Sequence, residues 1–160
     1  MQDLMEDGIE LQTLWYRAPE VLYGDQEYSV DSWSLGLVLV ELGGFHFHKA
    51  TKTQRYTQID YSVALFQQLG TPSIERLTRL AHWPGQPPKF QRKPWPGAVW
   101  SALGLPGVSM VEKLLAFDSS LRMGVASAAA HDFVSPERFG LGGRYREGCG
   151  FVPAASPASE

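Results

Sequence analysis

Residues 29–42 constrain the fold more than any other part of the sequence, because this segment is apolar on nearly every side in its second half. A segment of that kind must be buried, since no polar face is left for water. Periodicity alone does not separate a core helix from a parallel strand over the continuous apolar run at 37–40. The length of the segment and the polar residues Ser29 and Asp31 near its start favour a helix, which the two glycines after Leu42 end.

Two neighbouring segments also have helical patterns. Residues 19–23 begin with proline at the first helical position and are followed by Gly24, which predicts a short helix. A longer helix is predicted over 60–69, with Asp60 as its cap and Gly70 at its end. Its apolar stripe is predicted to contain Ile59, Val63, Leu65, Phe66 and Leu69.

Three helices are predicted in the remainder. Thr71 followed by Pro72 is typical of a cap and first helical residue, and predicts a short helix to about residue 81. Ser109 and Glu112 have the spacing of a capping box, so we expect a helix to start there. Residues 122–133 are rich in alanine and predict the last helix.

A proline-rich loop is predicted over 84–106. Six of the 11 prolines lie in this stretch, which argues against regular structure. Trp95 and Trp100 are interleaved with them, so we expect the loop to be held against the domain by its aromatic side chains. Residues 138–160 are rich in Gly, Ala, Ser and Pro, and we expect a flexible tail there.

Size and charge exclude several classes of function. A chain of 160 residues has room for one domain. With a net charge of −3 it lacks the basic surface that nucleic acid or anionic lipid requires, so we expect neither as a partner. No apolar run reaches the length of about 18 residues that spans a membrane. The single Cys149 cannot form an internal disulfide, and we expect a cytoplasmic or nuclear protein.

Several motifs occur in an order that identifies a family. Thr13-Leu-Trp-Tyr-Arg-Ala-Pro-Glu20 is followed by Asp31-Ser-Trp-Ser-Leu-Gly36, then Leu69-Gly-Thr-Pro72, and then Leu114-Leu-Ala-Phe-Asp118 with Arg122. This series resembles eukaryotic serine/threonine protein kinases of the cyclin-dependent and MAP kinase-like (CMGC) group, where Ala-Pro-Glu closes the activation segment. The resemblance implies an all-α fold, the helical C-terminal lobe of an incomplete kinase domain at 1–137.

The resemblance also implies four structural residues. Glu20 and Arg122 would form a buried ion pair, although two solvated charges are the alternative from the residues alone. Asp31 would sit at the start of the central helix, where its kinase counterpart binds the catalytic loop. From the residues alone it is an ordinary first-turn carboxylate stabilised by the helix dipole, and the two interpretations are compatible. Trp33 belongs to the core in either case. With the catalytic loop missing, we expect one flank of the central helix to be uncovered.

A substrate-binding segment is implied at the beginning of the motif series. Thr13, Leu14, Trp15 and Arg17 resemble the loop that receives the residue after the phosphorylated Ser or Thr, which is often proline in this group. The alternative is that Trp15 is a core aromatic, which is at least partly true in the family as well.

No catalytic, cofactor-binding or metal-binding residue is predicted in this chain. The glycine-rich loop, strand lysine, H-R-D and D-F-G motifs that handle ATP and magnesium in a kinase are missing from the sequence, so these cofactors are expected only in a complete parent. Asp132-Phe133 lies too late in the chain to be a D-F-G motif. The Phe45-His-Phe-His48 run is expected to pack its rings inward rather than bind zinc.

Three hypotheses follow. The first is a partial serine/threonine kinase domain, inactive alone, whose complete parent transfers the γ-phosphate of ATP to protein Ser or Thr, with a preference for sites before proline. The second is a stand-alone, non-catalytic lobe that binds kinase partners or substrates. An unrelated helical bundle is the third. Protein substrates and a cyclin-type regulatory subunit are the partners that the resemblance implies.

Overall fold

The computed structural model covers all 160 residues and describes residues 13–25, 29–47, 57–73, 75–80, 82–83 and 85–135. Within these ranges every regular element is helical, so the predicted all-α class is confirmed for them. The predicted tail at 138–160 lies outside the described residues. The elements are two 3-10 helices, η1 (Leu14–Tyr16) and η2 (Asp132–Val134), and α1 (Pro19–Leu22), α2 (Val30–Leu42), α3 (Gln58–Leu69), α4 (Glu75–Thr78), α5 (Gly97–Leu114) and α6 (Val125–Ala129).

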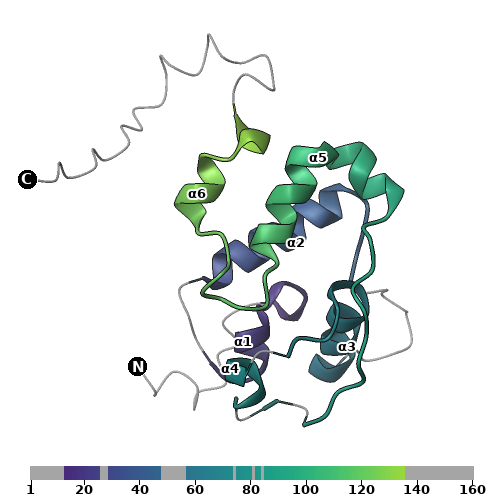
Figure 1. Ribbon diagram of the computed structural model, residues 1–160, viewed down its shortest axis with the longest axis vertical. Coiled ribbons are helices and arrows are strands. Elements are labelled where there is room, and N and C mark those ends of the chain that lie inside the picture. The colour runs from purple at the N-terminus through teal and green to yellow at the C-terminus, as the bar shows by residue number, and fades with distance from the viewer. Residues whose placement is uncertain are drawn as a thin grey trace, which may run out of the picture.

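Helices α2 and α5 pack against each other, and α1 and α3 lie below them in the view of Figure 1. Trp33 and Val40 of α2 and Val111 and Leu114 of α5 are all fully buried between these elements. The prediction of a buried central helix is therefore confirmed. In the described part of the chain, no helix combines the length and apolar character needed to cross a membrane.

Two apolar side chains of α2 are exposed among the described residues. Val38 and Leu42 lie one helical turn apart and are 41% and 72% exposed. The second half of the helix is mainly apolar, yet this stripe lacks a covering element among the described residues.

Helix α3 begins earlier than predicted because a different residue caps it. Thr57 is the N-cap, and its hydroxyl accepts from the backbone N–H of Asp60 at 3.2 Å. The Asp60 carboxylate in turn accepts from the backbone N–H of Thr57 at 2.9 Å, which completes a reciprocal capping box. The prediction of Asp60 as the cap is thus wrong, as is the burial of Ile59, which is 67% exposed in the first turn. Gly70 ends the helix as predicted.

The Asp60→Asn variant should be less resistant to urea at neutral pH, because it loses the charge that favours the helix N-terminus and one carboxylate acceptor. The backbone and hydroxyl hydrogen bonds from Thr57 lower the pKa of Asp60 below its ordinary value of 3.8. The stabilisation is therefore present above pH 3.8 and is lost as the pH falls through the lower folded pKa. Urea unfolding followed by tryptophan fluorescence should show the difference between variant and wild type shrinking in acid. Asp132→Asn, at another exposed position, is the matched control, and a difference that does not change with pH would contradict the prediction.

Helix α4 is shorter than predicted and is not capped by Thr71. The Thr71 hydroxyl instead donates to the carbonyl of Pro88 at 2.7 Å and accepts from the N–H of Phe90 at 2.9 Å. The Thr71 backbone N–H also donates to the Phe90 carbonyl at 3.0 Å. The threonine therefore ties the end of α3 to the proline-rich segment. Its hydroxyl bonds to this segment instead of capping α4.

Helix α5 overturns two predictions. Regular structure starts at Gly97, inside the predicted loop at 84–106, and Ser109 lies within the helix rather than at its start. The helix is kinked at Gly104, whose φ of 63° is available to glycine at little steric cost. Pro106 consequently sits in the first turn of the second half, where proline is tolerated. The density of prolines concealed this helix in the sequence.

The proline-rich stretch before α5 is held to the core by aromatic residues, as predicted for Trp95. Trp95 is 5% exposed and packs edge-on against Phe45 and Phe47, with ring centroids 5.8 and 6.2 Å away. The inward packing of these two Phe rings is therefore confirmed, while His48 lies outside the described residues. Trp100 differs from the expectation, because it is 42% exposed on α5.

The last helix is shorter than the predicted 122–133. It comprises α6 at Val125–Ala129 and a separate 3-10 turn, η2, at Asp132–Val134. Ala128 is buried, whereas Val125 is 60% exposed and so is not part of a packed face. Phe133 of η2 packs on α5 where Gly107 leaves room for it, since a Cβ at Gly107 would lie 2.7 Å from the Phe133 ring.

Candidate functional site

An ion pair between Glu20 and Arg122 joins the two ends of the described chain. The guanidinium donates to both carboxylate oxygens, Nη1 to Oε1 at 2.5 Å and Nη2 to Oε2 at 2.9 Å. The two side chains are 3% and 0% exposed. The structure therefore brings together the two residues that the sequence resemblance pairs, which lie 102 positions apart.

The rest of the Arg122 guanidinium is also satisfied. Its Nε donates to the Ala116 carbonyl at 3.1 Å, and Nη1 donates to the carbonyl and hydroxyl of Ser29, each at 3.1 Å. The guanidinium carbon lies 5.2 Å from the centre of the Trp33 ring. Arg122 thus fastens α1, the start of α2 and the loop after α5 to one another.

Trp33 and Asp31 occupy the first turns of α2 but differ in environment. Trp33 is fully buried and packs against Phe117, with ring centroids 5.7 Å apart. Asp31 is exposed in the first turn, where the helix dipole stabilises a negatively charged carboxylate. The structure therefore shows the ordinary first-turn arrangement for Asp31, and Trp33 belongs to the core as expected.

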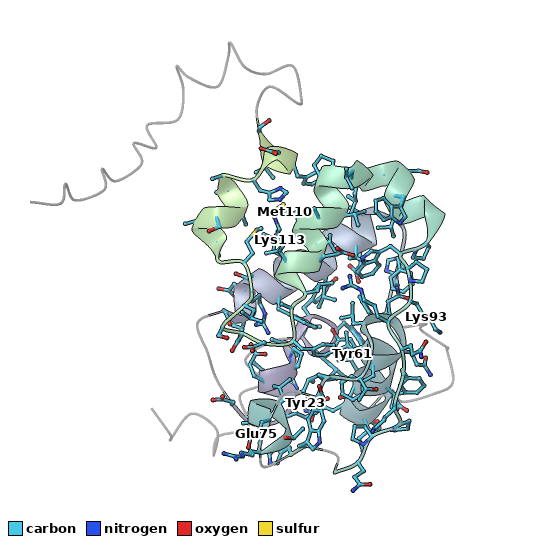
Figure 2. All side chains as sticks on the ribbon, in the orientation of Figure 1. Tyr23, Tyr61, Glu75, Lys93, Met110 and Lys113 are labelled. Atoms are coloured by element: carbon cyan, nitrogen blue, oxygen red, sulfur yellow. The ribbon has the colours of Figure 1, made fainter. Side chains whose placement is uncertain are left out.

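The segment from Thr13 to Arg17 lies on a platform made by α2 and α3. Tyr61 of α3, which lies in the interior of the molecule (Figure 2), donates its hydroxyl to the Trp15 carbonyl at 2.7 Å. Ser34 of α2 donates to the Tyr16 carbonyl at 2.9 Å. The Trp15 ring meets the Tyr61 ring edge-on at 5.8 Å. Two helices thereby fix the path of this segment through its own backbone carbonyls.

Tyr16 adds a third attachment, on the outer end of α2. Its hydroxyl donates to a carboxylate oxygen of Glu41 at 2.9 Å. The hydrogen bond to the Glu41 carboxylate, together with burial, raises the pKa of Tyr16. Burial likewise raises the pKa of Tyr61. Both hydroxyls therefore remain protonated donors at neutral pH, which keeps the segment attached.

The four residues predicted to contact substrate differ in accessibility. Thr13 is exposed, while Leu14 and Trp15 are half-buried within and beside η1. Arg17 is only 6% exposed, so its side chain is largely enclosed by the protein. The part of the segment that can meet another molecule in this structure is therefore Thr13 to Trp15.

Sequence reasoning missed the residues that hold this segment. Tyr61, Ser34 and Glu41 all belong to helices whose patterns identify them only as core or surface positions. The spacing of a helix indicates which face a side chain occupies but not which distant carbonyl its hydroxyl reaches. The sequence indicates only that Ser29 is a polar residue near the start of α2. In the structure the Ser29 hydroxyl also accepts a hydrogen bond from Arg122.

Titratable side chains that could hold a metal ion are scattered in the described part of the chain. The described residues contain no group of three or more His, Cys, Asp or Glu side chains arranged to hold a metal. His46 instead lies 3.5 Å from a Glu41 oxygen at the surface. Asp132 is exposed at the start of η2, where its neighbour Phe133 packs on α5.

Comparison with known proteins gives consistent results. Residues 8–134 match the family model described as "Protein kinase domain". The chain is 35% identical over 134 residues to "Cell division control protein 2 homolog 2" of Trypanosoma brucei brucei. It is 36% identical over 129 residues to a serine/threonine-protein kinase of Kluyveromyces lactis, and 32% identical over 133 residues to "Cyclin-dependent kinase G-2" of Oryza sativa subsp. indica. These matches cover 81%, 78% and 76% of the chain, but only 37%, 19% and 18% of the respective relatives.

Proposed function

The chain belongs to the protein kinase domain family and is similar to cyclin-dependent kinases, and from this premise we propose that it is the substrate-docking lobe of a serine/threonine kinase. The observation that carries this proposal is the anchored segment at residues 13–17. Its carbonyls accept from Tyr61 and Ser34, while Thr13 remains exposed. A rigid segment with an accessible side is suited to hold a peptide in one register.

The complete kinase would transfer the γ-phosphate of ATP to Ser or Thr of protein substrates. Among the described residues, no cluster of side chains is arranged to hold a magnesium ion. The residues of this chain would instead position the peptide and hold the lobe rigid through the Glu20–Arg122 pair. The rice relative is named a cyclin-dependent kinase. On this basis we propose a cyclin-type subunit as the regulatory partner of the complete kinase.

A peptide containing Ser-Pro should bind the 160-residue chain more tightly than the same peptide with Ser-Ala. We expect a preference of about threefold or more, because the proline ring buries additional apolar carbon against the half-buried Leu14 and Trp15. Chemical shifts of ¹⁵N-labelled protein, followed during titration, should change first at residues 13–17.

The Leu14→Ala variant should lose this preference, while Leu121→Ala should keep it. Leu121 is 75% exposed and lies outside the anchored segment, so it is a matched Leu-to-Ala control. Mg-ATP, added in place of peptide, should produce no comparable changes. Equal affinities for the two peptides, or changes centred away from residues 13–17, would refute the docking role.

A second candidate function is favoured by the exposed stripe of α2. Val38 and Leu42 offer exposed apolar surface on a helix whose opposite face is in the core. A stand-alone, non-catalytic lobe could use this stripe to bind a kinase partner or substrate. Under this alternative the Leu42→Ser variant would weaken partner binding, whereas residues 13–17 would be unaffected.

A further inference from the structure

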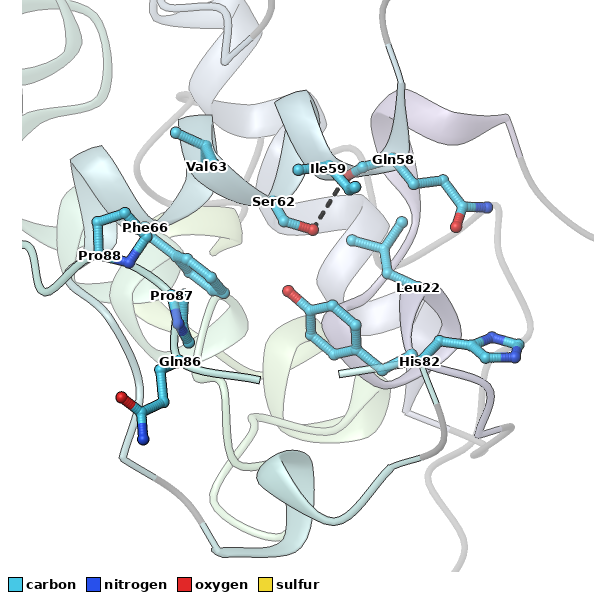
Figure 3. A pocket seen from close by; sticks show the side chains of 11 residues that line it. Leu22, Gln58, Ile59, Ser62, Val63, Phe66, His82, Gln86, Pro87 and Pro88 are labelled. Carbon is cyan, nitrogen blue, oxygen red and sulfur yellow. Dashed lines mark hydrogen bonds between the residues drawn. The ribbon is translucent and has the colours of Figure 1, made fainter. Parts of the chain in front are cut away.

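Three Ser-Pro or Thr-Pro pairs occur in the sequence, and their hydroxyls differ in availability. The pairs begin at Thr71, Ser135 and Ser156, of which Ser156 lies outside the described residues. The Thr71 hydroxyl is occupied, since it donates to the Pro88 carbonyl at 2.7 Å and accepts from the Phe90 N–H at 2.9 Å. Pro88 in turn lines a cavity beside α3 (Figure 3), so the Thr71 hydroxyl is already used to hold this segment in place.

Ser135 ends the turn η2, and its hydroxyl is available. The residue is half-buried, and its hydroxyl makes no hydrogen bond to another residue in the described part of the chain. Its backbone has a φ of −64° and a ψ of 135°, which is the extended conformation that a following proline favours. Ser135 is therefore presented at the end of an element, where an enzyme can reach it without unfolding a helix.

A carboxylate lies next to Ser135 on the same turn. The Ser135 backbone N–H donates to the Asp132 carbonyl at 3.4 Å. Side chains three residues apart in a 3-10 turn lie above one another, so the exposed Asp132 side chain shares an edge of η2 with Ser135. Glu137 and Arg138, the next charged residues in the sequence, have opposite charges. A phosphate on Ser135 would therefore add about two negative charges beside an existing one.

Two hydrogen bonds to His131 hold η2 in its conformation. The Val134 N–H donates to the His131 carbonyl at 2.9 Å, and the Phe133 N–H donates to the His131 ring nitrogen Nδ1 at 3.3 Å. This conformation directs the Phe133 ring onto α5, where a Cβ at Gly107 would lie 2.7 Å from it. Repulsion between like charges on the turn opposes the same conformation, and so opposes the packing of η2 on α5.

We propose that Ser135 is phosphorylated by a serine/threonine kinase that acts before proline, and that the phosphate loosens the packing of η2 on α5. In this reaction the Ser135 Oγ bonds to the γ-phosphorus of ATP while the bond from that phosphorus to the β-phosphate oxygen breaks. ADP leaves, and the hydroxyl proton passes to a base of the kinase and then to water. A separate kinase molecule supplies the catalytic site, so the proposal does not depend on the docking role of residues 13–17.

The modification is tested on the full chain in a Ser156→Ala background, which removes the Ser-Pro hydroxyl outside the described residues. The protein is incubated with Mg-ATP and an active cyclin-dependent kinase bound to its cyclin, and the phosphate is located by mass spectrometry. It is expected at Ser135, and Pro136→Ala should slow its incorporation about 10-fold or more, because the kinase loses apolar contacts with the proline. Absence of phosphate at Ser135, a preference for Thr71, or equal rates with Pro136→Ala would each overturn the proposal.

Amide hydrogen exchange of the phosphorylated chain measures the loosening of η2. Exchange at Phe133 and Val134 should be about 2- to 5-fold faster than in the unmodified chain, as expected for like charges on one turn. Asp132→Asn should remove most of this increase. Ser135→Glu should give a smaller increase, and it tests the effect where phosphorylation is incomplete.

Ser73→Glu is the matched control for the added charge, because Ser73 is exposed before α4 and away from η2. It should leave the exchange of η2 as it is in the wild type. If exchange at η2 were unchanged by the phosphate, or rose equally without the Asp132 carboxylate, the proposed effect of the modification would be wrong.

Discussion

Replacing Arg122 with methionine is expected to lower the free energy of unfolding by about 3–5 kcal/mol, because the substitution leaves a buried carboxylate without its partner. Glu20 is 2% exposed, so water cannot take the place of the guanidinium. The bidentate hydrogen bonds to Glu20 and the further donations to Ala116 and Ser29 are lost together. A domain of this kind has a total stability of about 5–15 kcal/mol, so a large part of its margin would be removed.

The measurement is urea unfolding followed by far-ultraviolet circular dichroism. Arg92→Met provides the matched control, because Arg92 pairs with Glu112 at 2.5 Å but the two side chains are 51% and 43% exposed. Surface pairs contribute about 0–1 kcal/mol, so this variant should unfold close to the wild type. If Arg122→Met were no less stable than Arg92→Met, the buried pair would not stabilise the attachment of α1 to the start of α2 and the loop after α5.

The double variant Glu20→Leu with Arg122→Met should be more stable than the sum of the two single changes predicts. Removing both charges eliminates the unpaired ion that dominates each single variant. Recovery should be partial, because the carbonyls of Ala116 and Ser29 still lose their donor. Strict additivity would show that the two groups do not interact, and would contradict the ion pair.

The ion pair also marks what the sequence could predict. Hydrophobicity predicts the burial of α2, because a segment apolar on nearly every side in its second half has few places other than a core, while its length and polar start favour a helix. No local pattern relates Glu20 to Arg122, and their meeting is expected only because ordered motifs resemble those of kinases. The anchoring of residues 13–17 by Tyr61 is not foreseeable at all, since helical periodicity does not specify hydroxyl partners.

The errors have physical causes in particular residues. The sequence predicts loop before Ser109 because prolines usually exclude helix, but the positive φ of Gly104 divides α5 so that Pro106 falls in a permitted first turn. It predicts Asp60 as a cap because an acidic residue near a helix start commonly has that role. In the structure Asp60 is the third residue of the helix, and its carboxylate completes a capping box whose N-cap is Thr57.

The second large effect is expected at the crossing of α2 and α5. Gly36 of α2 faces the end of α5, and a Cβ there would be 2.7 Å from Leu115 Cδ2 and 3.0 Å from Leu114 Cβ. In an open helix, Gly to Ala would stabilise by about 1 kcal/mol. In this position overpacking opposes the gain, and such insertions typically cost about 1–3 kcal/mol.

We therefore expect Gly36→Ala to lower the free energy of unfolding, because the closer contacts cannot be relieved by one side-chain rotation. Leu115 Cδ2 can move, but Leu114 Cβ is attached directly to the backbone of α5, so the helix itself must shift. Gly97→Ala is the matched control, since nothing lies within 4 Å of a Cβ at the start of the same α5. Urea midpoints should fall for Gly36→Ala and stay level or rise for Gly97→Ala.

Combining Gly36→Ala with Leu115→Ala distinguishes a steric origin from a change in helix propensity. Removing the Leu115 side chain destabilises by itself, because the residue is 4% exposed and leaves a void. The new Cβ would partly fill that void, so the double variant should be less destabilised than the two single losses added together. If the losses simply add, the close approach of α2 and α5 does not depend on the missing Cβ of Gly36, and the central packing of this lobe requires a different explanation.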